Sequence, residues 1–129
     1  MDKLEEEVNR LFEKFNFIVH AECINDLVNI LQNEGNSGVF LSCLDTRLKS
    51  LESLGYEATK LNSFEKLTNN KNLYSIKFKG KHNIRILYSY NEKSNECLLL
   101  SFFEKTGKRK TEYSHYIPTA RRRFNELSN

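Results

Sequence analysis

The sequence predicts an α+β fold in which helices come first and an antiparallel sheet of about four strands follows. Apolar residues recur at helical spacing through most of the first 55 residues, whereas residues 73–104 alternate with the period of β-strands. Helices followed by a run of strands are typical of α+β domains, in which the helices gather largely on one side of the sheet. We expect residues 1–129 to form a single domain, because this length suits one hydrophobic core.

The first half predicts three helices and one short strand. Residues 3–15 form an amphipathic pattern with glutamates in the early turns, where the helix dipole favours them. "FNFIVH" reads as a short strand, and "ECINDLVNILQ" has the apolar stripe of a second helix. "VFLSCLDTRLKSLESL" predicts a third helix that ends before Gly55. Residues 56–72 are expected to be mostly loop, pinned to the core by Phe64 and Leu67.

The second half predicts a charged hairpin and a central strand over residues 73–104. "LYSIKFK" and "NIRILYSY" flank "GKH", which has the composition of a tight turn. "ECLLLSFFE" is apolar on both faces, as expected for a strand inside a sheet. Pro118 suits the first turn of a helix, so a last helix is predicted over residues 118–127.

The hairpin separates its side chains into two faces, because successive residues of a strand point to opposite sides. Tyr74, Ile76 and Phe78 share an apolar face with Ile84, Ile86, Tyr88 and Tyr90. The other face carries Lys77, Lys79 and Arg85, which hairpin pairing brings into one patch. We expect this basic patch to be open to solvent, since the helices are predicted to cover the apolar face.

Charge is distributed unevenly along the chain. Residues 1–70 hold 7 basic and 12 acidic residues, a net charge of −5, and residues 71–129 hold 13 basic and 5 acidic residues, a net charge of +8. A basic half indicates a polyanion partner such as RNA or DNA. An ordinary lysine-rich surface that discourages edge pairing of the sheet is the simpler alternative.

Other classes of protein are disfavoured by the sequence. No apolar run is long enough to span a bilayer, and the acidic start "MDKLEEEVNR" lacks the features of a secretory signal. Cys23, Cys43 and Cys97 have no CxxC spacing and lie in apolar stretches, so they are expected to be buried free thiols. We therefore expect a cytoplasmic protein with no metal and no cofactor.

Clustered cations on a sheet suit RNA cleavage without a metal. Each neighbouring cation lowers the pKa of a lysine and thereby fits it to accept a proton, whereas arginine stays charged and binds phosphate oxygens. The ribose 2′-hydroxyl of RNA can attack the adjacent phosphate once a base removes its proton. Cations then stabilise the charge that develops on the phosphate.

The stretches "LYSIKFKGKHNIRILYSY", "LLLSFFEKTGKRK" and "ARRRFNEL" together resemble the RelE/HigB-like toxins of bacterial type II toxin–antitoxin systems. The resemblance covers roughly the second half of the chain and depends on the order and spacing of the pieces. It implies a RelE-like (microbial RNase-like) antiparallel sheet with an extra N-terminal helix. It also implies an mRNA endoribonuclease, an mRNA interferase, that acts in the ribosome and inhibits translation.

The resemblance also implies roles for individual residues, although the segment after the apolar strand is about two residues longer than the family pattern. Lysine stands at position 77 where the family has an arginine, and the general acid and base stay unassigned. The candidate catalytic residues are Lys77, Lys79, Arg85, Lys105 and His115, and the candidate RNA-binding residues are Lys108, Arg109, Tyr113 and Tyr116.

The implied partners are a cognate antitoxin with a helix-turn-helix, HigA-like fold, mRNA and the 70S ribosome. Operator DNA is expected to be bound only through the antitoxin, and no membrane is involved. Two alternatives stay open. One is a ParE-like toxin that inhibits DNA gyrase by binding, and the other is a plain RNA-binding module.

Overall fold

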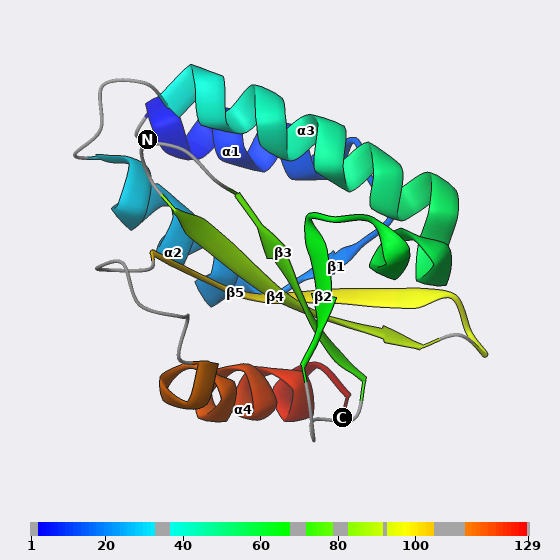
Figure 1. The fold of residues 1–129 in the computed structure, drawn as a ribbon. Coiled ribbons are helices and arrows are strands. Elements are labelled where there is room, and N and C mark those ends of the chain that lie inside the picture. The colour runs from blue at the N-terminus through cyan, green and yellow to red at the C-terminus, as the bar shows by residue number, and fades with distance from the viewer. Residues whose placement is uncertain are drawn as a thin grey trace.

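The chain folds into a five-stranded mixed sheet with helices on both faces (Figure 1). This computed structural model describes residues 3–32, 37–67, 72–78, 83–91, 93–104 and 113–128. In chain order the elements are α1 (Lys3–Glu13), β1 (Ile18–Val19), α2 (Ala21–Gln32), α3 (Ser37–Leu54), the 3₁₀ helix η1 (Gly55–Lys60), β2 (Phe64–Lys66), β3 (Leu73–Lys77), β4 (Ile84–Asn91), β5 (Glu96–Glu104), the 3₁₀ helix η2 (Tyr113–His115) and α4 (Ile117–Ser128).

The strand order β1-β5-β4-β3-β2 corrects the expectation of an antiparallel sheet of about four strands. Strands β2 to β5 pair antiparallel, but β1 pairs parallel to β5 through Ile18 and Val19 alone. The region 56–72, expected to be loop, contains η1 and β2. Strand β1 lies within "FNFIVH", where a short strand was expected. Strand β2 is three residues long, which is too short for an alternating pattern to show in the sequence.

The expectation that the helices pack on one side of the sheet holds for α1, α2 and α3 and is wrong for α4. Helices α1, α2 and α3 pack on one face, and α4 lies on the opposite face (Figure 1). The second face has its own apolar cluster, which includes Leu73, Leu87, Leu100, Phe103 and Ala120. None of the described helices is long and apolar enough to cross a membrane.

Several expectations from the sequence are confirmed. The two hairpin strands divide their side chains as predicted, with Ile76 and Ile86 in the core under α1–α3 and Leu87 in the cluster under α4. The apolar side of α1, whose partner the sequence left open, is buried within the domain at Val8, Leu11 and Phe12. Phe64 and Leu67 are buried as expected.

Two charged side chains close the part of the β5 edge that β1 leaves uncovered. The Phe102 N–H donates to Asp26 Oδ2 over 3.2 Å, and Arg123 Nη1 donates to the Leu100 carbonyl over 2.9 Å. Arg123 Nη1 also lies 2.6 Å from Asp26 Oδ2. This Asp26–Arg123 pair joins α2 on one face to α4 on the other, and it satisfies backbone groups that an open edge leaves unpaired.

The cysteines are free thiols, with Cys23 and Cys97 buried and Cys43 half-buried. Burial raises the pKa of Cys23 well above the ordinary 9.0, and the nearby Asp26 raises it further, while Arg123 lowers it. Burial likewise raises the pKa of Cys97. Thiols held in their neutral form pack as small apolar side chains rather than as nucleophiles.

Candidate functional site

Two candidate side chains, Lys77 and Arg85, stand in one row with Phe103 across the sheet on the face that α4 covers. Lys77 is the cross-strand partner of Arg85, and Arg85 is the partner of Phe103. The next row contains Ser75 opposite Leu87. Directly opposed residues of antiparallel strands project to the same side of a sheet. The register therefore brings Lys77 and Arg85 together, as the sequence predicts.

Arg85 is buried, with 6% of its surface exposed, so the expectation of an open basic patch was wrong at this residue. Its Nη1 donates to the carbonyl oxygen of the preceding Ile84 over 3.2 Å, and its Nε has no hydrogen-bond partner. Among the described residues, no carboxylate forms a salt bridge with it. A buried guanidinium without a counter-ion is costly, because its lost hydration is not replaced.

Lys77 has a carboxylate neighbour that sequence reasoning missed. Glu65 on β2 places its Oε2 at 3.8 Å from Lys77 Nζ. A carboxylate at this distance attracts the ammonium, so opposite charges lie side by side next to the row. The Lys77 backbone is held on both sides, since its N–H donates to the Ser63 carbonyl over 2.7 Å and its carbonyl accepts from Arg47 Nη1 over 3.0 Å.

Tyr113 on η2 contacts the next row at Ser75 and lies near Glu65 and Arg85. Its hydroxyl donates to Ser75 Oγ over 3.1 Å. Burial is the main cause that raises the pKa of Tyr113; the Ser75 hydrogen bond lowers it, the nearby Glu65 raises it and Arg85 lowers it. The phenol therefore lies within electrostatic reach of both the carboxylate and the guanidinium.

Aromatic rings from the segment before α4 lie over the end of the row. Tyr116 stacks on Phe103 with ring centroids 3.7 Å apart and planes 5° apart, and Tyr113 meets Phe103 edge-on at 6.0 Å. His115 is exposed, and its ring lies edge-on to Tyr116 at 6.4 Å. Because Phe103 is the cross-strand partner of Arg85, these rings bring the start of α4 next to the guanidinium.

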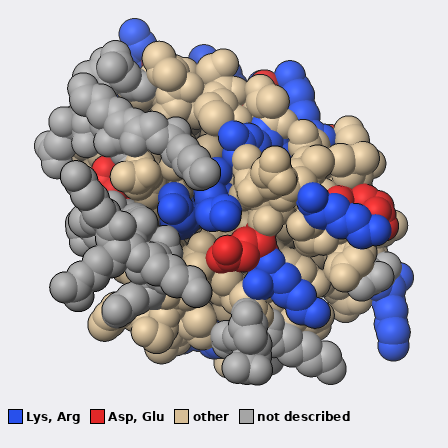
Figure 2. All heavy atoms as spheres, in the orientation of Figure 1, with Lys and Arg blue, Asp and Glu red and all other residues tan. Residues whose placement is uncertain are grey.

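The remaining predicted residues divide into two groups. Tyr113 and Tyr116 both contact the Phe103 ring, whereas the exposed His115 ring contacts Tyr116. Figure 2 shows basic and acidic side chains side by side on the viewed face of the described residues rather than one continuous basic surface. Four candidates, which are Lys79, Lys105, Lys108 and Arg109, lie outside the described residues.

The arrangement offers a cation pair, a carboxylate and a phenol within one small region. Its guanidinium can bind an anion, and its carboxylate can accept a proton. Glu65, Ser75 and Phe103 were missed as site residues. The sequence carried one signal for Phe103. It lies in a strand that is apolar on both faces, which indicates that both faces of the sheet are covered. In the part of the chain that the structure describes, no group of three or more His, Cys, Asp or Glu side chains is placed to hold a metal ion.

No protein-family model matches this sequence, and no curated protein matches it.

Proposed function

We propose that this protein is a RelE/HigB-like toxin of a type II toxin–antitoxin system and that it cleaves mRNA as an endoribonuclease in the ribosome. The proposal depends on the buried Arg85 guanidinium, which forms no ion pair with a described carboxylate, whereas the equally buried Arg123 pairs with Asp26. A phosphate group of RNA is the counter-ion that such a site lacks, because guanidinium binds phosphate oxygens in a planar, bidentate manner.

The reaction assigned to the site is attack of a ribose 2′-hydroxyl on the adjacent phosphorus. The new 2′-O–P bond forms as the bond to the 5′-oxygen breaks, which leaves a 2′,3′-cyclic phosphate and a free 5′-hydroxyl. Arg85 and Lys77 stabilise the negative charge that develops on the phosphate oxygens. Glu65 is the proton acceptor for the 2′-hydroxyl, since its carboxylate adjoins Lys77 at 3.8 Å.

The other candidates complete the proposal. The phenol of Tyr113 or the imidazole of His115 donates the proton to the leaving 5′-oxygen, because both lie in the segment that packs beside Arg85 through Phe103. Tyr116 contacts RNA with the part of its ring that Phe103 leaves uncovered. The proposal retains Lys79 and Lys105 as catalytic cations and Lys108 and Arg109 as RNA contacts. A helix-turn-helix, HigA-like antitoxin neutralises the toxin and carries it to operator DNA.

The test is induced expression in bacteria followed by primer extension on a translated mRNA. The wild-type chain should arrest growth and produce cleavage sites that disappear when translation is blocked. Arg85→Ala should reduce cleavage by roughly 10²- to 10³-fold, which is the usual effect of removing one charge-stabilising donor. Glu65→Gln should reduce it by roughly 10²-fold or more if the carboxylate accepts the proton.

Matched controls are Arg122→Ala and Glu57→Gln, which remove the same charges from exposed positions. Both should retain cleavage, and near-native circular dichroism of every variant excludes unfolding as the cause of lost activity. Growth arrest without cleavage products, unchanged in Arg85→Ala, would refute the ribonuclease proposal. Inhibition of gyrase supercoiling by the purified protein would then favour the ParE-like alternative.

A further inference from the structure

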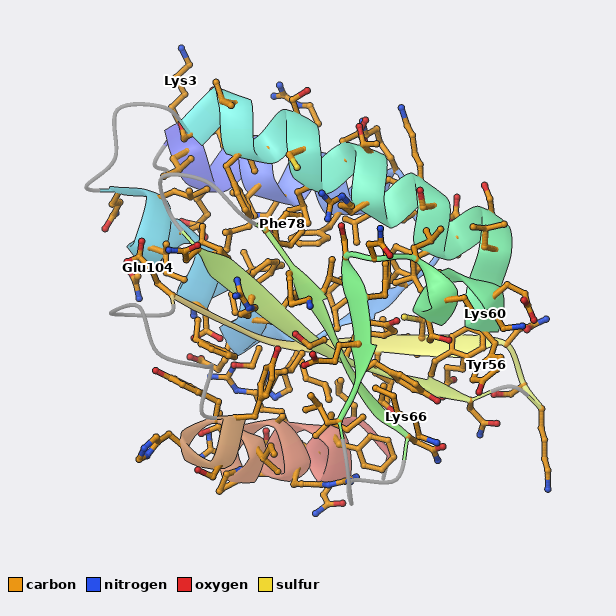
Figure 3. The ribbon with its side chains drawn as sticks, viewed as in Figure 1. Lys3, Tyr56, Lys60, Lys66, Phe78 and Glu104 are labelled. Atoms are coloured by element: carbon orange, nitrogen blue, oxygen red, sulfur yellow. The ribbon has the colours of Figure 1, made fainter. Side chains whose placement is uncertain are left out.

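A pocket of about 340 Å³ lies at the end of the sheet opposite Arg85. Tyr90, the seventh residue of β4, lines it, whereas Arg85 is the second residue of that strand. Five residues of extended chain separate the two by about 17 Å. Figure 3 shows the two ends of the sheet. Phe78 and Glu104 mark the end where Arg85 lies, and Tyr56, which follows the pocket-lining Gly55, marks the other end.

The pocket is negatively charged. Glu52 is the only charged side chain among the described residues that line it, and its Oε2 accepts the Asn16 N–H over 3.0 Å. Glu52 stands in the last turn of α3, a helix of 18 residues that has no basic residue in that turn. Helix carboxyl ends carry partial negative charge and favour cations, so a carboxylate placed there is unfavourable for the helix alone.

The walls of the pocket suit an alkyl chain that ends in a cation. The Tyr90 ring is fixed, because its hydroxyl donates to Asn95 Oδ1 over 2.6 Å. A side chain at position 55 would meet that hydroxyl at 2.6 Å, so Gly55, with a φ of 57°, lets the ring enter the pocket wall. Phe17 supplies a second aromatic ring, and Leu54, 46% exposed, supplies an apolar surface. Aromatic faces attract cations, and methylene groups pack on apolar walls.

We propose that this pocket binds one alkyl guanidinium or alkyl ammonium group, with the cation between Glu52 and the carbonyl end of α3. The site is separate from the proposed RNA site and goes beyond the proposed function. Its volume lies near the lower end of the range for small-ligand pockets, which suits one basic side chain or one end of a polyamine. The two sources share the same chemistry and are separated by the experiment.

The experiment is a titration of the ¹⁵N-labelled protein, followed by the amide chemical shifts. The probes are N-acetyl-arginine methylamide, its neutral isostere N-acetyl-citrulline methylamide, and spermidine. Arginine amide should shift the amides of Phe17, Leu54 and Tyr90, and citrulline amide should not. Glu52→Gln should weaken binding at least roughly tenfold, because a charge-assisted hydrogen bond is lost. Glu57→Gln, on exposed η1, is the matched control and should bind as the wild type does.

Each outcome decides the proposal. Tighter binding of arginine amide points to a polypeptide side chain as the source, and tighter binding of spermidine points to a free polyamine. Equal binding of the citrulline amide, shifts located away from the pocket, or unchanged affinity in Glu52→Gln would overturn it. Loss of RNA cleavage in Arg85→Ala has no bearing on this result, so the two proposals can fail independently.

Discussion

Two arginines are buried in this protein to nearly the same degree, and they differ in what surrounds them. Arg123, 7% exposed, pairs with Asp26 and donates to the Leu100 carbonyl. Arg85, 6% exposed, has one bond to the carbonyl of its own neighbour Ile84 and no ion pair with a described carboxylate. Both lie on the face of the sheet that α4 covers, yet only one is neutralised within the described residues.

This difference indicates different roles. Arg123 with Asp26 replaces the missing strand at the β5 edge and ties α2 to α4, which is a structural task. Arg85 contributes no such link, and the burial of its uncompensated charge is unfavourable. A buried charge that does not stabilise the fold is typical of binding and catalytic sites.

The first prediction removes the acid from the satisfied pair. Asp26→Ala should lower the free energy of unfolding by about 3–5 kcal/mol, because Arg123 is then buried without a counter-ion and the Phe102 N–H loses its acceptor. Urea denaturation measures the loss. Glu22→Ala, one turn earlier on α2 and exposed, should change stability by no more than about 0.5 kcal/mol. Equal effects of the two variants would show that the pair is not a clamp.

The second prediction concerns the stability of the protein at alkaline pH and its two buried thiols, Cys23 and Cys97. Folding raises the pKa of Cys23 and Cys97 above the ordinary 9.0. Their contribution to stability is therefore complete below about pH 9 and is lost as pH rises above it. At pH 10, each thiol should lower the free energy of unfolding by about 1.4 kcal/mol, because it ionises in the unfolded chain but not in the folded protein. Urea denaturation at pH 8 and pH 10 measures how far the free energy of unfolding falls over this range. The fall should be about 2–3 kcal/mol smaller in the double variant Cys23→Ala/Cys97→Ala than in the wild type. Identical pH slopes would contradict it.

The third prediction concerns the two tyrosines that pack near Arg85. Tyr113→Phe removes the hydrogen bond to Ser75, and it should lower the free energy of unfolding by about 1 kcal/mol. Tyr116→Phe keeps the stack on Phe103 and should change stability by no more than about 0.5 kcal/mol. A larger loss in Tyr116→Phe than in Tyr113→Phe would mean that the described contacts of Tyr113 do not hold this segment in place.

The elements with long regular patterns were predictable from sequence, and so was the division of the hairpin into two faces. The alternation of Ile84, Ile86 and Tyr88 with Arg85 and Leu87 allowed only one arrangement once a sheet was assumed. Helix α3 ended at Gly55 because a left-handed residue terminates a helix there. These features are local, so the local sequence specifies them.

The site was harder to predict, because its decisive features come from distant segments. Glu65 stands on a three-residue strand that has no readable period, so its approach to Lys77 could not be foreseen. The burial of Arg85 depends on α4 crossing to the second face of the sheet. The sequence did carry a hint of this, since Leu98 and Leu100 point away from the core under α1–α3 and still need cover. The pairing of Arg123 with Asp26 joins residues 97 positions apart.

The most direct test of the contrast is the free energy of unfolding of Arg85→Met, measured by urea denaturation beside Arg123→Met. Methionine keeps the unbranched apolar stem of the side chain as far as the position of the arginine Nε, and it removes the charge. The account predicts that Arg85→Met is at least as stable as the wild type, because replacing an uncompensated buried charge by an apolar group is neutral or stabilising, whereas Arg123→Met loses about 3 kcal/mol. Equal destabilisation by the two substitutions would contradict it, since Arg85 would then be a structural residue like Arg123.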